Sequence, residues 1–198
     1  AKLILRPRFK RQINQAWRLV SLGGKLTDIL LAQGVLKDRI CILPNGIESK
    51  WILSESESLE RKVRRQAQPT RFVLVGRNEY RKGLHVLQSA MDFVIDPIEL
   101  HLIGDWPEWY AGIHTVVHHG VVREKKEVMA LLDACDILLM PSLSEGMPTV
   151  ILEALARGLD VIATDVGACS EMIDRKMLVP PANAELLSRA IQEDSAAG

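Results

Sequence analysis

The sequence predicts an α/β fold in three layers, with a parallel sheet between two layers of helices. Two observations lead to this prediction. Short apolar runs alternate with segments of helical spacing from residue 71 to residue 193, and the apolar runs contain few polar residues. Strands that are buried on both faces have this character, because helices cover both faces of a parallel sheet. The predicted domain is therefore doubly wound and Rossmann-like.

The predicted elements follow one another in a regular order. After the first apolar run, 71–76, the chain places Leu84, Leu87 and Met91 on one face of a helix. The expected strands cover 71–76, 98–104, 114–120, 136–141, 160–164 and 176–181, and the expected helices cover 82–94, 124–135, 149–158 and 184–193. Ligands bind at the carboxyl ends of the strands in such a fold, so the loops after the first four strands are the expected site.

The expected domain boundaries follow from composition. Residues 1–47 contain one strand (17–23), one helix (25–34) and a second apolar run (39–46), which we interpret as the end of a preceding domain and the entry into the next. Residues 48–70 are rich in charge, with acids first and bases after, as expected of a linker. Residues 71–198 are the expected ligand-binding domain.

The composition indicates a globular chain with balanced charge. At 198 residues with 47% hydrophobic content, the chain is long enough for one sizeable core. The 25 basic and 25 acidic residues cancel, so the overall charge does not favour nucleic acid as a partner. Cys41, Cys135 and Cys169 lack CxxC spacing, which argues against a disulfide framework or a zinc site and fits a reducing cytoplasm.

The N-terminal segment is basic, since residues 1–18 contain no acid. We interpret it as a solvated basic face, with contact to an anionic membrane surface as the alternative. No apolar run approaches the ~20 residues that span a bilayer, and the first residues lack the apolar centre of a signal peptide. The expected location is the cytoplasm, and the inner face of the membrane is where such contact would occur.

The segment SEGMPTVILEALARG at 144–158 carries the first candidate site. We expect Pro148 to begin a helix without a side-chain cap, which leaves amide N–H groups to attract phosphate, and Gly146 to let a ligand approach closely. Glu145 and Glu153 flank this point and would repel phosphate. We therefore expect each to accept hydrogen bonds from the hydroxyls of a sugar, in a ligand that carries one sugar at each end of a diphosphate. The alternative is a loop acid at Glu145 and an exposed helix acid at Glu153.

The loop VGRNEYRKG after the first strand carries the second candidate site. Arg77, Arg81 and Lys82 are suited to bracing a diphosphate, and the alternative is a solvated basic loop. The loop is not a P-loop, because Arg81 stands at a glycine position and Gly83 follows the lysine. The chain contains no GxGxxG, no GxSxG and no Asp-x-Asp pair, and its histidines lack partners at ligand spacing, so we expect no metal site.

Several segments together resemble the C-terminal, donor-binding domain of GT-B-fold retaining glycosyltransferases. This large family has a Glu-x7-Glu element and includes bacterial sucrose, glycogen and mannosyl transferases. The matching segments are VSLGGKLTDILLAQGVLKDRICILPNGIE, FVLVGRNEYRKG, LHLIGD, HHGVV, CDILLMPSLSEGMPTVILEALARG and VIATDVGACSEMI, within residues 17–192. The chain departs from the family pattern at Trp106, Asp160 and Ala168, which bears on local loop shape.

The resemblance implies a role for each candidate residue. Arg77 and Lys82 would contact the diphosphate, Glu145 would face the sugar hydroxyls, and Glu153 would bind the ribose. The sugar and phosphate would be held by the backbone of Gly146, Met147 and Pro148 together with Thr149. The loop after HHGVV would help to seat the base.

The resemblance also implies the reaction and the partners. A hexosyl group would pass from a nucleotide diphosphate sugar to a glycan, lipid or small-molecule acceptor, with retention and without a metal or other cofactor. The body of the acceptor domain and the long final helix of the family are expected to be missing from this chain. The alternatives are a sugar-nucleotide epimerase of similar fold and a nucleotide-sugar-binding module without catalysis.

Overall fold

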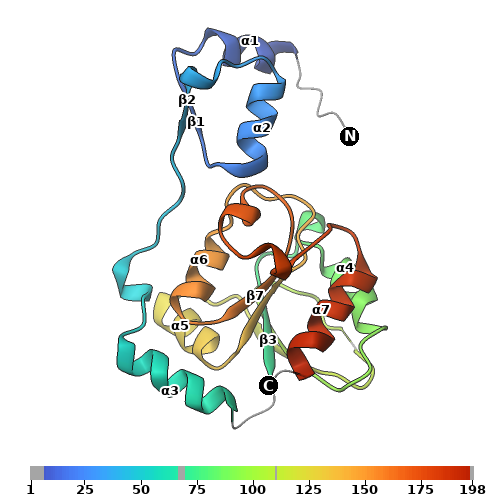
Figure 1. The fold of residues 1–198 in the computed structure, drawn as a ribbon. Coiled ribbons are helices and arrows are strands. Elements are labelled where there is room, and N and C mark those ends of the chain that lie inside the picture. The colour runs from blue at the N-terminus through green and yellow to red at the C-terminus, as the bar shows by residue number, and fades with distance from the viewer. Residues whose placement is uncertain (1–6, 67–69, 110, 197–198) are drawn as a thin grey trace.

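The computed structural model of the chain describes residues 7–66, 70–109 and 111–196. Residues 1–6 of the basic segment, 67–69 of the expected linker and 197–198 lie outside the described residues. Within these ranges the strands form a parallel two-stranded sheet and a parallel six-stranded sheet, in the order β5-β4-β3-β6-β7-β8 (Figure 1). The strands are β1 Leu19–Ser21, β2 Ile40–Ile42, β3 Arg71–Val75, β4 Glu99–Ile103, β5 Thr115–Gly120, β6 Ile137–Met140, β7 Asp160–Thr164 and β8 Leu178–Val179.

The larger sheet confirms the predicted fold, because each expected strand is present and helices cover both faces. The α-helices are α1 Pro7–Gln15, α2 Gly24–Ala32, α3 Glu55–Gln66, α4 Leu84–Met91, α5 Lys125–Asp133, α6 Thr149–Ala156 and α7 Ala184–Ala196. Helices α4 and α7 pack on the face that carries Phe72 and Leu74, whereas α5 and α6 pack on the face that carries Val73. Side chains alternate between the faces of a strand, so β3 supplies both cores.

The N-terminal unit comprises α1, β1, α2 and β2 and lies beyond one end of the larger sheet (Figure 1). Strands β1 and β2 pair in parallel, with Leu19 opposite Ile40. The unit is joined to the sheet domain by the connecting segment, residues 43–48, and then by the 3₁₀ turn η2 Ser49–Trp51 and α3.

Helix α3 lies within the expected linker and was not predicted. Its start has a capping box, because the Ser54 backbone N–H donates to Glu57 Oε2 at 2.7 Å and the Glu57 N–H donates to Ser54 Oγ at 3.3 Å. The guanidinium of Arg61 then donates to the Gly158 carbonyl at 3.1 Å and to the Asp133 carbonyl at 3.0 Å. These contacts hold α3 against α5 and α6. The order of acids before bases suits the helix dipole.

Two loops meet at the carboxyl end of the larger sheet. The chain after β3 forms the 3₁₀ turn η3 Tyr80–Lys82 and then Gly83, whose φ is +73°. A Cβ atom at Gly83 would lie 2.0 Å from the carbonyl oxygen of Pro141, so only glycine fits here. The Leu143 N–H donates to the Arg81 carbonyl at 2.7 Å. The loops after β3 and β6 are therefore joined before any ligand binds.

Candidate functional site

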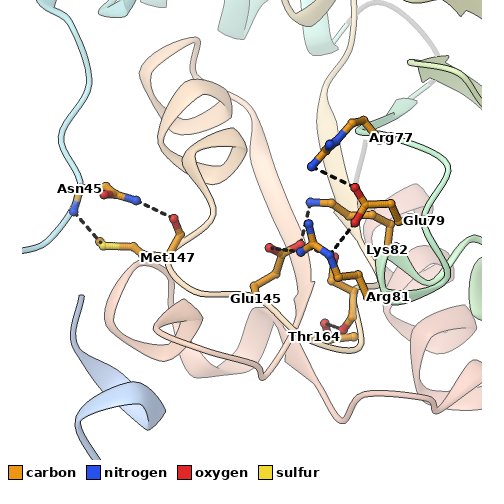
Figure 2. A network of polar contacts seen from close by, with 9 residues as sticks. Asn45, Arg77, Glu79, Arg81, Lys82, Glu145, Met147 and Thr164 are labelled. Atoms are coloured by element: carbon orange, nitrogen blue, oxygen red, sulfur yellow. Dashed lines mark hydrogen bonds and ion pairs between the residues drawn. The ribbon is translucent and has the colours of Figure 1, made fainter. Parts of the chain in front are cut away.

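Lys82 and Glu145 form the centre of the candidate site (Figure 2). Lys82 Nζ donates to Glu145 Oε1 at 2.7 Å, and the same oxygen accepts from Ser142 Oγ at 2.8 Å. The side chains are only 17% and 7% exposed, respectively. Burying such a pair is costly unless further hydrogen bonds compensate, and Ser142 supplies one. The sequence predicted both charged residues but not Ser142.

Glu79 pairs with the two arginines of the same loop. Arg77 Nη2 lies 2.9 Å from Glu79 Oε1, and Arg81 Nε lies 2.6 Å from Glu79 Oε2. Arg81 also reaches Glu145, with Nη1 3.4 Å from Oε2. Figure 2 shows these side chains gathered in one cluster. Sequence reasoning noticed the cations and missed Glu79, although its position between two arginines was visible.

The start of α6 lacks a side-chain cap. Pro148 is the N-cap residue with an extended backbone (φ −70°, ψ 116°), and α6 begins at Thr149. The expected helix 149–158 begins where α6 begins, whereas the placement of Pro148 as its first helical residue was wrong by one position, because this ψ is not helical. Among the described hydrogen bonds, none is donated by the amides of Gly146, Met147, Thr149 or Val150. These amides can therefore donate to an anion.

The segment before α6 is held through its carbonyl oxygens. Gly146 accepts a hydrogen bond from the Ala168 N–H at 2.8 Å, and Met147 accepts one from Asn45 Nδ2 at 2.8 Å. Gly167, next to Ala168, has a φ of +56°. A Cβ atom there would lie 2.1 Å from the Gly146 oxygen. Sequence reasoning missed Asn45, because its partner lies 102 residues away.

Glu153 lies half-buried on α6. Burial raises the pKa of its carboxyl, and the positive charge of Lys125 opposes this shift in part. In the part of the chain that the structure describes, its carboxylate makes no hydrogen bond or ion pair. A carboxylate in this state can accept hydroxyl donors, and such hydrogen bonds favour its ionised form.

The histidines form a separate network on the larger sheet. His101 Nδ1 lies 2.8 Å from His119 Nε2, and His101 Nε2 lies 2.7 Å from Glu99 Oε1. Burial and the neighbouring His101 and His118 lower the pKa of His119.

Metal-binding clusters and membrane-spanning helices are both absent from the described residues. No group of three or more His, Cys, Asp or Glu side chains is placed to hold a metal ion in the described ranges. No helix among the residues described is both long and apolar enough to cross a membrane.

The chain is similar in sequence and in structure to proteins named as glycosyltransferases. TuaC of Bacillus subtilis (strain 168), named provisionally as a teichuronic acid biosynthesis glycosyltransferase, is 32% identical over 190 residues, which cover 92% of this chain and 48% of TuaC. The apo structure of the lipopolysaccharide outer core galactosyltransferase WaaB matches with a TM-score of 0.75 at 20% identity, over 92% of this chain and 54% of that one. HepE of Anabaena, solved in complex with UDP-glucose, matches with a TM-score of 0.69 at 18% identity, over 97% and 60%.

The chain thus spans about half the length of TuaC. At these identities the structural matches establish the fold, which is GT-B, as the resemblance implied. The family described as glycosyl transferases group 1 matches residues 69–193, which include both loops of the site and all of the larger sheet. The chain therefore belongs to the glycosyl transferases group 1 family.

Proposed function

We propose that this chain is the donor-binding half of a retaining glycosyltransferase that moves a hexosyl group from a nucleotide diphosphate sugar to an acceptor hydroxyl. The observation that carries the proposal is the partly buried Lys82–Glu145 pair, which lies in the loops beside the uncapped start of α6. A cation, free amides and a sugar-directed carboxylate are together the groups that such a donor needs. The complex of HepE with UDP-glucose supports this class of ligand.

Each part of the donor has a partner in this scheme. The diphosphate lies against the amides that open α6, with Lys82 and Arg77 offsetting its charge. Glu145 accepts hydrogen bonds from the sugar hydroxyls through Oε2, because Oε1 already accepts from both Lys82 and Ser142, whereas Oε2 accepts one longer bond, from Arg81 at 3.4 Å. Glu153 accepts the ribose hydroxyls. The bond between the anomeric carbon and the diphosphate oxygen breaks, and the acceptor hydroxyl oxygen forms the new bond to that carbon. The hydroxyl proton passes to the departing diphosphate, whose remaining charge Lys82 stabilises.

Glu79 acts as the counter-ion of the free site. Arg77 and Arg81 are paired with its carboxylate, and phosphate oxygens take its place when the donor binds. The exchange is inexpensive for Arg77, whose side chain is 76% exposed, since an exposed ion pair contributes at most about 1 kcal/mol.

The domain assignment belongs to the same proposal. Residues 71–198 form the donor domain, and residues 1–47 belong to the end of the acceptor domain. The acceptor, a glycan, lipid or small molecule, binds to that domain.

Calorimetry with UDP, UDP-glucose and a GDP-hexose tests the proposal. Lys82→Ala removes a charge-assisted contact to phosphate, so UDP binding weakens by about 10- to 100-fold. Glu153→Ala loses the ribose contact and weakens binding by about 10-fold. The matched control is Lys176→Ala, which removes an exposed lysine of the same domain and leaves the affinity unchanged. Unchanged affinity in both Lys82→Ala and Glu153→Ala contradicts the site.

The pH dependence of UDP binding supplies a second measurement. Burial raises the pKa of Glu153, and the ribose hydroxyls bind its ionised form. Affinity therefore rises as the pH increases through the raised pKa of the Glu153 carboxyl. Glu153→Gln removes this dependence. A slope that persists in Glu153→Gln assigns the titration to another group.

A further inference from the structure

Asn45 holds one residue of the candidate site in two ways. Its side-chain Nδ2 donates to the Met147 carbonyl at 2.8 Å, and its backbone N–H lies 3.2 Å from Met147 Sδ. Figure 2 shows this pair beside the cluster around Glu145. Asn45 belongs to the connecting segment 43–48, whereas Met147 lies two residues before α6 begins at Thr149.

The Met147 carbonyl lies outside the hydrogen-bond ladder of α6. The first bond of that helix runs from the Ile151 N–H to the Pro148 carbonyl at 3.2 Å. Pro148 follows Met147 and has no N–H, so the peptide that joins them cannot be oriented by donating a hydrogen bond. In the described residues, Asn45 is the partner that holds this carbonyl in place.

The neighbouring peptide is held independently. The Gly146 carbonyl accepts from the Ala168 N–H, and a Cβ atom at Gly146 would lie 3.4 Å from Leu22 Cδ1 of the N-terminal unit. The carbonyl and the following N–H of a trans peptide point in opposite directions, so a held Gly146 carbonyl also aims the Met147 N–H. The segment 145–148 is thus oriented by the loop after β7 on one peptide and by Asn45 on the next.

We propose that Asn45 is a positioning residue for the nucleotide-sugar site. By holding the Met147 carbonyl, it sets the direction in which the chain enters α6 and therefore where the amides of Thr149 and Val150 point. Donor binding then depends on the connecting segment as well as on the sheet domain. This inference rests on the proposed function, because it concerns the amides that bind the diphosphate.

A simple tether between the two parts of the chain is the competing explanation. Lys25 offers the matched comparison, since its Nζ lies 2.8 Å from Asp165 Oδ2 and joins the same two parts. The Lys25 side chain does not contact residues 145–148 in any described hydrogen bond. A tether role predicts similar behaviour when either side chain is truncated, whereas a positioning role predicts a loss of donor affinity only for Asn45.

The test compares UDP affinities by calorimetry in Asn45→Ala, Asn45→Asp and Lys25→Ala, with Lys82→Ala as the reference for the site. We expect binding to weaken about 5- to 10-fold in Asn45→Ala and further in Asn45→Asp, whose carboxylate would face the Met147 carbonyl. Lys25→Ala stays within about twofold of the unmodified chain. Amide hydrogen exchange of Ile151, whose N–H donates to the Pro148 carbonyl, quickens in Asn45→Ala and not in Lys25→Ala. If an Asn45 variant does not fold, Asn45→Ser is measured in its place, because the serine side chain is too short to reach the Met147 carbonyl.

These measurements distinguish a failure of the positioning role of Asn45 from a failure of the proposed function. If Lys82→Ala weakens UDP binding and the Asn45 variants bind like the unmodified chain, the positioning role is wrong and the proposed function stands. If Lys25→Ala loses as much affinity as Asn45→Ala, Asn45 is a tether. If neither Lys82→Ala nor Glu153→Ala changes UDP binding, the proposed function falls and the positioning role falls with it.

Discussion

Helices α2 and α6 both begin without a side-chain cap, but they differ in whether their first amide N–H groups have hydrogen-bond acceptors. Neither N-cap residue, Gly23 or Pro148, makes a side-chain cap hydrogen bond. At α2 the Gly24 N–H donates to Glu171 Oε1 at 2.6 Å, and the Lys25 N–H donates to the Gly167 carbonyl at 3.0 Å. At α6 the corresponding amides have no described acceptor.

The difference shows that the uncapped amides of a helix start can either join two parts of the chain or remain available to a ligand. The first amides of any helix need partners from outside the helical ladder. At α2 these partners come from the sheet domain, so the helix start joins the N-terminal unit to the loop after β7. At α6 the neighbouring chain holds only carbonyl oxygens, so the N–H groups remain for a ligand. The same loop after β7 serves both helices, through Gly167 on one side and Ala168 on the other.

Gly167→Ala is the variant for which this comparison predicts the largest effect. The residue has a φ of +56°, and its Cβ would lie 2.1 Å from the Gly146 oxygen and 2.6 Å from the Glu145 oxygen. The loop must move away from both helix starts, so we expect a loss of about 3 kcal/mol or more in unfolding free energy, with weaker UDP binding. Denaturant unfolding and calorimetry measure the two effects.

Gly34→Ala is the matched control for Gly167→Ala. Gly34 has a φ of +87°, and an added Cβ atom would meet no other atom within 4 Å, so only the backbone cost of about 1–2 kcal/mol remains. UDP affinity stays unchanged. Equal losses of stability in the two variants show that the close approach of Gly167 to Gly146 is unimportant.

Pro148→Ser gives α6 the side-chain cap that it lacks. The serine oxygen can accept from an amide of the first turn, which stabilises the protein by about 1 kcal/mol relative to Pro148→Ala. Both variants lose the proline, so their difference isolates the cap. We expect UDP to bind about 3- to 10-fold more weakly to Pro148→Ser than to Pro148→Ala, because the cap competes with phosphate. Equal UDP affinities in the two variants place the phosphate elsewhere.

The smallest expected effect is that of Glu171→Gln at α2. The substituted side chain can still accept from the Gly24 N–H and loses only its charge at the helix start, so stability falls by about 0.5 kcal/mol. UDP affinity is unchanged, because the amides of α2 are not part of the proposed site. Glu108→Gln, in an exposed loop, is the control. A clear loss of UDP binding in Glu171→Gln contradicts the view that the start of α6 binds the ligand and the start of α2 does not.

The fold was predictable because burial leaves a periodic record in the sequence. Strand β6, Ile137–Met140, is buried throughout and reads as an unbroken apolar run, as a central parallel strand should. Helix α3 was missed although Ser54 and Glu57 form a capping box, because its charged residues were interpreted as a linker.

The candidate site was predictable only in part. Lys82 and Glu145 stand in loops at the carboxyl end of a predicted sheet, so their proximity followed from topology. Their direct pairing and the hydrogen bond from Ser142 did not, because side-chain geometry depends on loop backbone that has no periodic signal. The roles of all the candidate residues remain predictions that the binding experiments address.

The sequence by itself determined the order of strands and helices, the family, and the loops in which a ligand would bind, because these depend on local pattern and chain order. Only the tertiary structure decided which polar groups already have a hydrogen-bond or ion-pair partner within the protein. Glu79 neutralises the arginines, Glu171 occupies the start of α2, and Asn45 holds Met147 before α6. Glu171 and Asn45 reach partners more than a hundred residues away in the chain, and such pairings exist only once packing brings the two segments within hydrogen-bond distance.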